Sequence, residues 1–265
     1  MGAPVHFIRS IVKYREMVLA LAWRDLQSKY AGTLGGWLWM IAHPVAIVTV
    51  FYFVFAVGFK AKGGGSAPYI LWFVSGLVPW IFFNSSLISI TNSVSRNMHL
   101  VKKTIFPTEI FPIVYLSSEL FTHAVFFVIL CGMLVFFNIT FTPGRLLFLY
   151  FLFSTSFLLL GLGWLLSALQ VFYKDISEAL TILLNLLFWG TPIVWSPSIL
   201  PKEYLGIVEY NPMYYIVEGY RGTLVYDHVV LPGITQTISF WTIAVLVFLV
   251  GNYVFRRLQP EFADI

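Results

Sequence analysis

The chain has 265 residues, of which 59% are hydrophobic and only 11% are charged, whereas soluble domains carry roughly 25% charged residues. This composition excludes an ordinary soluble domain and predicts an all-α integral membrane protein with a single domain, residues 1–265. The net charge of +4 gives no reason to expect a nucleic-acid partner, and the single cysteine, Cys131, excludes an intrachain disulfide.

Six stretches without Asp, Glu, Lys or Arg divide the chain. A helix needs about 20 residues to cross the hydrocarbon layer, and a charge at its centre costs roughly 2.5 to 3.5 kcal/mol, so we expect one transmembrane helix in each stretch. The stretches are residues 30–59, 63–95, 120–144, 146–173, 179–201 and 228–255. Six spans place both termini on one side. Eleven of the 16 basic residues fall on that side, so the positive-inside rule predicts that both termini are cytoplasmic.

Residues 1–30 form a predicted cytoplasmic helix at the membrane interface. An apolar stripe recurs there at helical spacing, with a polar face opposite. The stripe is Leu19, Trp23, Leu26 and Tyr30, and the polar face is Arg24, Asp25, Ser28 and Lys29. Two interpretations stay open, namely a basic anchor that orients the first span and a surface for a partner subunit.

The first span presents an aromatic face. Tyr52, Phe55 and Phe59 share this face with Val48. A tyrosine hydroxyl in the middle of a span needs a partner or water. The face is therefore a candidate lining for a pathway, and ordinary bundle packing is the alternative.

Residues 96–108 leave one span and enter the next. Their basic members, His99, Lys102 and Lys103, stand beside the apolar Met98, Leu100 and Val101. Phe106-Pro107 closes the piece, because proline disfavours helix at the residue before it. We interpret this amphipathic piece as a docking element held between two spans.

Two further spans carry small or polar groups. Glu119 and His123 stand at i, i+4 in the third span, close enough to pair. An acidic side chain within a span is expected to have a functional role. A purely structural hydrogen-bonded pair is the alternative. Gly161 and Gly163 in the fourth span are expected to allow a close helix approach.

The fifth span has one polar and aromatic face, while its other positions are Leu and Ile. On a helical wheel the face comprises Glu178, Thr181, Asn185, Phe188, Pro192 and Trp195. Polar groups that face lipid go unsatisfied. The face therefore lines either a wet pathway, where aromatic rings and amides suit sugars, or a seam between helices.

Residues 196–235 form the long external segment. Its prolines divide it into two short helical pieces, the second being Tyr214–Leu224 with Glu218 and Arg221 at i, i+3. Its tyrosines suit half-inserted, re-entrant helices at the outer interface. We interpret the segment as an external gate whose candidate residues are Tyr214, Tyr215, Tyr220 and Arg221.

Motifs of catalysis are absent from the sequence. It contains no GxxxxGK[ST], HExxH, CxxC, GxSxG or Gly-rich dinucleotide fingerprint. Its five histidines, at positions 6, 43, 99, 123 and 228, lack ligand spacing. We expect no catalytic residue, no metal site and no cofactor in this chain.

Several segments in order carry a family resemblance. They are KYAGTLGGWLWMIAHP (residues 29–44), SGLVPWIFFNSS (75–86), NMHLVKKTIFPTEIFP (97–112), TPIVWS (191–196), NPM (211–213) and YRG (220–222). With these segments the chain resembles the permease subunits of polysaccharide-exporting ABC transporters, the O-antigen, capsule and teichoic-acid group.

The resemblance implies a homodimer of six-span subunits in the bacterial inner membrane that moves an undecaprenyl-linked glycan outward. It implies two separate ATPase subunits, which hold ATP and Mg, and a coupling helix in this chain that sits on them. The coupling residues would be Asn97, His99, Lys102, Lys103 and Phe106. The first and fifth spans would line the path, through Tyr52, Phe55, Phe59, Thr181, Asn185, Phe188 and Trp195.

The sequence leaves alternatives to export of O-antigen-like glycan. A teichoic-acid or capsule exporter is the near alternative. A drug or small-molecule exporter of the same fold should have a less aromatic pocket and should lack the long outer segment. A membrane-embedded enzyme acting on lipid-linked sugars should show several acids near metal or phosphate ligands, and the isolated Glu119 supports it poorly.

Overall fold

The computed structural model describes residues 3–60, 68–103 and 107–264, and side chains for residues 13–60, 68–102, 107–201 and 203–262. Within these ranges the fold is helical, without strands, as the composition predicts. Five helical segments are long and apolar enough to cross a membrane, and they correspond to the first, second, third, fourth and sixth predicted spans. They are Leu38–Gly58, Tyr69–Thr91, Thr108–Phe136, Pro143–Phe172 and Ile234–Phe262.

The remaining predicted span is a shorter helix. This helix, α8 (Ile176–Gly190), has 15 residues, which at a rise of about 1.5 Å each span less than the roughly 30 Å of a hydrocarbon layer. The chain leaves helical conformation at Thr191, directly before Pro192. Proline removes a helical hydrogen-bond donor and restricts the residue before it, so α8 ends earlier than the charge-free stretch does.

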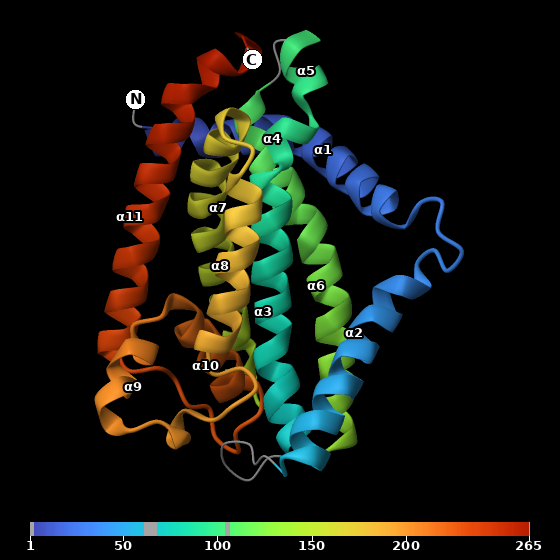
Figure 1. Cartoon of the computed structure of the whole chain (residues 1–265), viewed down its shortest axis with the longest axis vertical. Coiled ribbons are helices and arrows are strands. Elements are labelled where there is room, and N and C mark those ends of the chain that lie inside the picture. The colour runs from blue at the N-terminus through green and yellow to red at the C-terminus, as the bar shows by residue number, and fades with distance from the viewer. Residues whose placement is uncertain (1–2, 61–67, 104–106, 265) are drawn as a thin grey trace.

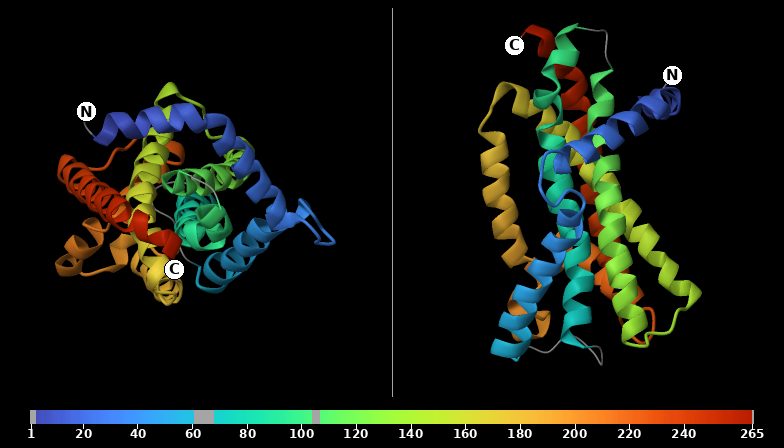
Figure 2. Two further views of the ribbon diagram at one scale, coloured as in Figure 1. Left: turned by 90° about the horizontal axis from the view of Figure 1, so that it is seen from above. Right: turned by 90° about the vertical axis from the view of Figure 1, so that its right-hand side faces the viewer.

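The two ends of the bundle differ (Figure 1). One end holds both termini, together with the short helices α4 (Ser93–Arg96) and α5 (Met98–Lys103). Across this end lies the long N-terminal helix α1 (Ala3–Tyr30), as Figure 2 shows. At the other end lie two short helices of the predicted outer segment, α9 (Lys202–Glu209) and α10 (Pro212–Leu224). The division of that segment into two short helices is confirmed.

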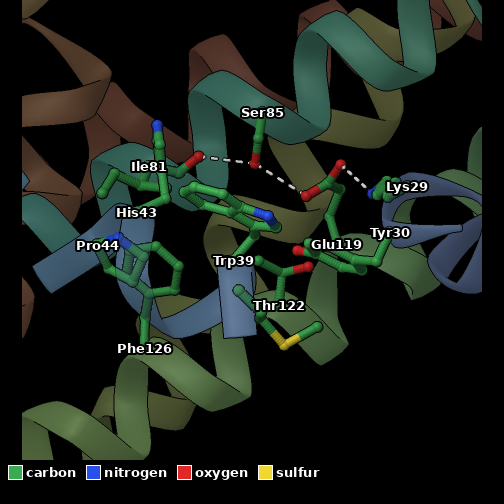
Figure 3. Close-up of a pocket in the computed structure, with 11 residues that line it drawn as sticks. Lys29, Tyr30, Trp39, His43, Pro44, Ile81, Ser85, Glu119, Thr122 and Phe126 are labelled. Carbon is green, nitrogen blue, oxygen red and sulfur yellow. Dashed lines mark hydrogen bonds and ion pairs between the residues drawn. The ribbon is translucent and has the colours of Figure 1, made fainter. Parts of the chain in front are cut away.

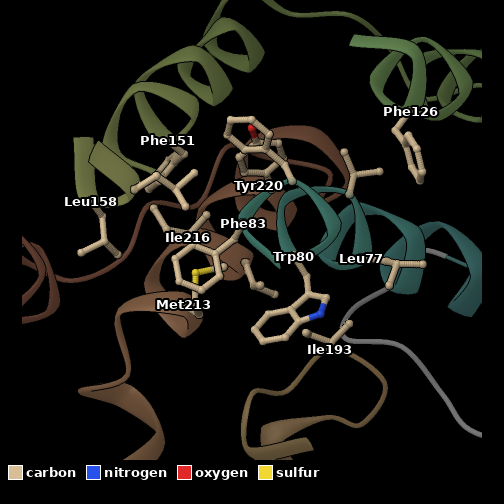
Figure 4. Packing of buried hydrophobic residues seen from close by; sticks show 14 of the residues in the cluster. Leu77, Trp80, Phe83, Phe126, Phe151, Leu158, Ile193, Met213, Ile216 and Tyr220 are labelled. Atoms are coloured by element: carbon tan, nitrogen blue, oxygen red, sulfur yellow. The ribbon is translucent and has the colours of Figure 1, made fainter. Parts of the chain in front are cut away.

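Helix α3 (Tyr69–Thr91) forms the centre of the fold. It packs against α6 (Phe111–Phe136), α7 (Phe148–Phe172), α8 and α10. Its side chains Leu77, Trp80 and Phe83 lie in a large apolar core that also includes Met213 and Ile216 of α10 (Figure 4). This burial on nearly every side makes α3 the axis around which the other helices are arranged.

Small residues bring α7 and α11 (Ile234–Leu258) into close contact, as the small-residue pattern predicts. A Cβ atom on Gly161 would lie 2.7 Å from the Cα of Phe248, and one on Gly251 would meet the carbonyl oxygen of Gly161. Gly163 lies against Ile90 of α3 in the same way. Glycine permits the backbones to touch, which is how helices gain packing area where lipid offers no hydrophobic drive.

The first span begins as α2 (Leu38–Phe51) and continues as a π-helical turn, η1 (Tyr52–Gly58). The rings of Phe51, Phe55 and Phe59 follow one another at centroid distances of 6.0 and 5.6 Å. Residues four apart lie on one face of a helix. Phe51 therefore joins the predicted aromatic face, and Tyr52 lies on a more open side, 40% exposed.

One sequence interpretation of a surface needs correction. In α10, Tyr215 and Tyr220 are fully packed in the core and do not lie at an outer surface; of the segment's tyrosines, only Tyr204 and Tyr210 are exposed. In α1, Val18, Ala22 and Leu26 are buried against the bundle, and Leu19 and Trp23 of the predicted stripe are exposed. The place of α1 at a membrane interface stays a prediction.

Candidate functional site

The predicted pathway residues lie on η1, at the end of the first span, and on the α8 segment, and the two spans meet where Phe51 of α2 contacts Phe188 of α8. The ring of Phe188 in α8 packs edge-on against Phe51 at a centroid distance of 5.9 Å and against Trp80 of α3 at 5.6 Å. Phe55 and Trp195 are partly buried and pack against the main core, whereas Phe59 is 73% exposed. The first and fifth predicted spans therefore form one continuous aromatic surface.

Beside this surface α8 exposes polar groups among large apolar ones. Thr181 and Asn185 are exposed, as are Ile182, Leu183 and Leu186 around them. The Thr181 hydroxyl donates to the carbonyl of Ser177 at 2.9 Å. The Asn185 amide has no hydrogen bond within the described part of the chain. An amide in a membrane helix requires a partner, so α8 offers an unsatisfied donor and acceptor to whatever contacts it.

The wheel prediction fails beyond the end of α8. Pro192 is buried, and its carbonyl oxygen accepts a hydrogen bond from Arg221 at 2.6 Å. Trp195 lies on the following turn, where its indole nitrogen donates to the carbonyl of Trp189 at 3.0 Å. The exposed face of α8 is therefore shorter than predicted, and Trp189, 56% exposed, joins it.

An ion pair ties α1 to the bundle (Figure 3). The ammonium group of Lys29 lies 2.7 Å from Oε1 of Glu119, a side chain of α6 that is nearly fully buried. Ser89 of α3 donates to the same oxygen at 2.7 Å, and the Ser85 hydroxyl lies 3.0 Å from Oε2. Three helices thus meet at one carboxylate. Because an ionised carboxylate only accepts hydrogen bonds, these donors suit its charged form.

Asp25 extends this network along α1. Its carboxylate lies 3.4 Å from the Lys29 ammonium and accepts a hydrogen bond from Ser118 at 2.6 Å. Burial acts to lower the pKa of Lys29, but the carboxylates of Glu119 and Asp25 outweigh it and raise this pKa above its ordinary value. Lys29 therefore stays protonated throughout the physiological pH range.

The predicted pair of Glu119 and His123 does not form. The imidazole Nε2 of His123 lies 3.2 Å from the hydroxyl of Tyr220 in α10, and its Nδ1 has no partner among the described residues. The lysine that pairs with Glu119 is 90 positions away in the sequence. A spacing of four residues shows that two side chains share a helical face, but the packing of α1 and α10 decides which partner each one meets.

The predicted coupling residues divide into a structural and an exposed set. Asn97, at the corner between α4 and α5, is buried, and its amide donates to the Ser93 carbonyl at 2.8 Å and to the Tyr115 hydroxyl at 2.9 Å. His99 and Lys102 are exposed on α5. The side chain of Lys103 and the whole of Phe106 lie outside the described residues.

A second apolar cluster packs against the side of α5 that faces the bundle. It combines Val94 of α4 with Phe111, Phe255 and the buried Phe262 near the C-terminus, and Met98, Leu100 and Val101 pack against it. The predicted amphipathic character of this piece is confirmed, because its apolar side chains face the bundle and its exposed ones are polar or basic.

Two buried arginines, Arg145 and Arg221, hold α10, although the predicted six-span topology places both of them on the external side. The Arg221 guanidinium donates to the carbonyls of Ile193 at 2.9 Å and Trp72 at 3.2 Å, besides that of Pro192, and pairs with Glu218 at 2.8 Å. Arg145 donates to the carbonyls of Thr140, Thr223 and Leu224. The predicted gate residues Tyr215, Tyr220 and Arg221 are thus part of a packed anchor, and Tyr214 is partly buried.

Comparison with known proteins assigns the chain to a family. The family model of ABC-2 type transporters matches residues 16–225, most of the chain. The chain belongs to the ABC-2 type transporter family. The family resemblance predicted from the sequence is confirmed, and the chain is a membrane transport protein with several spans.

Curated relatives of this ABC-2 transporter match along nearly their whole length. An O-antigen export system permease protein RfbA of Klebsiella pneumoniae is 26% identical over 262 residues, covering 94% of this chain and 95% of the relative. A protein of the same name from Myxococcus xanthus is 24% identical over 266 residues, covering 98% and 99%. The family match runs from α1 to the end of α10, so it includes the α2–α8 surface, the Lys29–Glu119 pair and the arginine anchor.

Sequence reasoning missed three groups of this ABC-2 transporter that the structure brings forward. They are Lys29 as the partner of Glu119, Arg145 as an anchor of α10, and Phe262 beneath the coupling element. A partial signal existed for the first: Asp25 and Lys29 stand at i, i+4 on one face of a predicted helix, and Glu119 is a lone acid in the third predicted span.

Proposed function

We propose that this chain is the membrane-spanning subunit of an ATP-driven exporter of lipid-linked, O-antigen-like polysaccharide. The ABC-2 family and the names of the relatives support this proposal. One structural observation carries it furthest. The α8 helix exposes Thr181 and Asn185 beside the aromatic surface of α2, Phe188 and Trp189.

This combination suits a glycan better than it suits lipid. Aromatic rings offer flat apolar surfaces to the C–H faces of sugars, whereas the Asn185 amide and the Thr181 hydroxyl can bond to sugar hydroxyls. Lipid tails would leave the amide unsatisfied, at a cost of several kcal/mol. A path lined by α2 and α8 would therefore accept a hydrated chain that moves between weak, repeated contacts.

A single copy leaves this path open on one side. The span Leu38–Gly58 is only 11% buried within the chain, and most of α8 is exposed. Two copies that face each other through α2 and α8 would enclose the path, so we infer a homodimer. In that arrangement α8 and the turn after it form a sixth, short span, and both termini lie on the same side.

The energy for transport would come from a partner. We infer two copies of an ATPase subunit, each holding ATP and Mg and contacting α5 through His99 and Lys102. The position of α5 beyond the bundle, at the same end as both termini, supports this inference (Figure 1). Those features would lie in the cytoplasm of a bacterium, with α1 at the surface of its inner membrane and α9 and α10 as re-entrant helices at the outer end.

The outer gate is proposed as a unit that moves with α3. Arg221 binds α10 to the Trp72 carbonyl of α3 and to the turn after α8. A lid that swings freely on its own loop would have to break these buried bonds. Movement of α3, which continues through α4 into α5, would carry α10 with it.

The test is a depletion experiment in the organism of origin. Loss of this chain should leave lipid-linked glycan inside the cell, where a lectin added to intact spheroplasts does not reach it. Purification of the tagged chain should retain an ATPase with a P-loop, identified by mass spectrometry. Unchanged surface glycan after depletion, or a chain that purifies without any ATPase, would contradict the proposal.

A further inference from the structure

A cavity of about 380 Å³ lies between α1, α2, α3 and α6. Its volume falls within the range of roughly 300 to 1,000 Å³ that is common for ligand sites. Lys29, Ser85 and Glu119 line one side, and Pro44 and Phe126 lie on the other (Figure 3). The rim carries Tyr30 and Trp39, side-chain types that are common at membrane interfaces.

The cavity is amphipathic in the direction that a lipid requires. Its charged side belongs to the end of the bundle where α1 lies, and its apolar side, including Ile81 and Phe126, is formed by the long helices α3 and α6. A lipid presents a polar headgroup at the membrane surface and hydrocarbon below it. A sugar chain would find little polar surface on the apolar side.

The charges of the network do not cancel. Among the described side chains, Lys29 is the one cation within ion-pair distance of Asp25 or Glu119. Asp25 does not line the cavity but lies 3.4 Å from the Lys29 ammonium group, so two carboxylates share one cation and the network beside the cavity keeps an excess of one negative charge. His43 also lines the cavity, but it forms no ion pair with the described residues. The site therefore favours a cation over an anion.

Two acceptors in the cavity are incompletely used. Oε1 of Glu119 accepts hydrogen bonds from Lys29 and Ser89. Oε2 lies near only one donor, the Ser85 hydroxyl, and the single hydrogen of that hydroxyl can instead bond to the Ile81 carbonyl, 2.8 Å away. The buried hydroxyl of Thr122, one helical turn further along α6, has no partner among the described residues. A primary ammonium group carries three hydrogens and can satisfy both oxygens.

We propose that this cavity binds a membrane phospholipid with a primary-amine headgroup, such as phosphatidylethanolamine. The ammonium group lies against Glu119 and Thr122, the phosphate stays at the level of α1, and an acyl chain follows Ile81 and Phe126 between α2 and the bundle. The bound lipid fills the cavity between α2 and the helices α1, α3 and α6. Nothing in this arrangement depends on which substrate the protein exports.

Lipid retention tests the proposal on the purified full-length chain. Phosphatidylethanolamine, phosphatidylcholine and phosphatidylglycerol with identical acyl chains are added at equal concentration, and bound lipid is counted by native mass spectrometry. We expect phosphatidylethanolamine to be retained about tenfold better than phosphatidylcholine, because choline cannot donate the charged hydrogen bond. Equal retention of the two lipids overturns the proposal.

Variants assign the selectivity to the cavity. Glu119→Gln should bring the ratio of retained phosphatidylethanolamine to retained phosphatidylcholine close to one. Thr122→Val should lower this ratio while leaving the Lys29–Glu119 pair in place. Glu178→Gln removes an exposed acid in the first turn of α8 and should leave the ratio unchanged. If Glu119→Gln does not fold, the result for Thr122→Val decides. An unchanged ratio in Thr122→Val together with an unchanged ratio in folded Glu119→Gln overturns the proposal.

Photolabelling of the wild-type chain locates the lipid without any variant. Phosphatidylethanolamine with a diazirine in its acyl chain should label peptides that contain Trp39–Pro44 and Thr122–Phe126 more strongly than the exposed face of α11. Even labelling of all lipid-facing helices overturns the proposal.

Discussion

The central carbon of the Arg221 guanidinium lies 3.5 Å from the centre of the Trp72 ring. The same guanidinium donates to three backbone carbonyls, two of them in the turn that follows α8. Gly76 leaves the necessary space, because a Cβ there would lie 2.6 Å from Nη2 of Arg221. One buried side chain thus joins α3, α8 and α10, and it accounts for the packed position of the predicted gate.

Arg221→Met should destabilise the protein by about 3 kcal/mol or more, because it leaves Glu218 and three carbonyls without their partner. Arg221→Lys should recover only part of this loss, since an ammonium group lacks the planar fork. Thermal unfolding in detergent measures the effect. Arg257→Lys, at an exposed arginine of α11, is the matched control. A stable Arg221→Lys variant with wild-type behaviour would show that the fork is not required.

Gly161→Ala should separate α7 from α11 and lower stability, because the added Cβ would lie 2.7 Å from the backbone of Phe248, which cannot move away cheaply. Gly132→Ala is the matched control, since nothing lies within 4 Å of its added Cβ. That change should be neutral or stabilising by up to about 1 kcal/mol, the helix-propensity difference. Equal unfolding temperatures for the two variants would contradict the close packing.

Lys29→Met should release α1 from the bundle and leave Glu119 as an unpaired buried charge, at a cost of about 3 kcal/mol. The doubly changed variant Lys29→Met with Glu119→Gln should be more stable than Lys29→Met alone, because no buried charge remains unpaired. Limited proteolysis within α1 and thermal unfolding report the two effects. If the double variant loses the sum of both single losses, the two side chains are not coupled.

Joint replacement of Lys102 and Lys103 by Glu should abolish co-purification of the ATPase and leave membrane insertion unchanged, because the basic side chains of α5 are proposed to contact the partner. Lys174→Glu is the control, an exposed lysine in the turn that joins α7 to α8. Co-purification is measured by affinity capture and mass spectrometry. Normal recovery of the ATPase with the double replacement would contradict a docking role for these lysines.

Asn185→Leu should slow export about tenfold, the effect of losing one hydrogen bond of about 1.4 kcal/mol to the moving glycan. The oligomeric mass should stay the same. Leu183→Ala, at an exposed apolar position of the same helix, should change export less. Surface glycan and mass in detergent are the two readouts. Dissociation into single subunits would instead assign Asn185 to a seam between helices, the alternative that the sequence left open.

The sequence by itself determined the membrane character and the position of most helices. Charges are so costly in hydrocarbon that their absence over residues 63–95 or 146–173 marks a span wherever the chain folds. Prolines and turn residues act just as locally, so the two short helices of the outer segment were also predictable. Helical spacing alone predicts part of the aromatic and polar face of the fifth span, namely Thr181, Asn185 and Phe188, but not the end of α8 before Pro192.

Only the tertiary structure decided where the charged side chains lie. By loop position Arg145 and Arg221 count as external residues, yet both are buried because the ends of α10 and the turn after α8 supply clusters of free carbonyls. Glu119 meets Lys29 and not His123, because α1 packs against α6 and brings Lys29 to that carboxylate. A buried charge requires whichever partner the packing brings to it, and no local pattern identifies a partner 90 residues away.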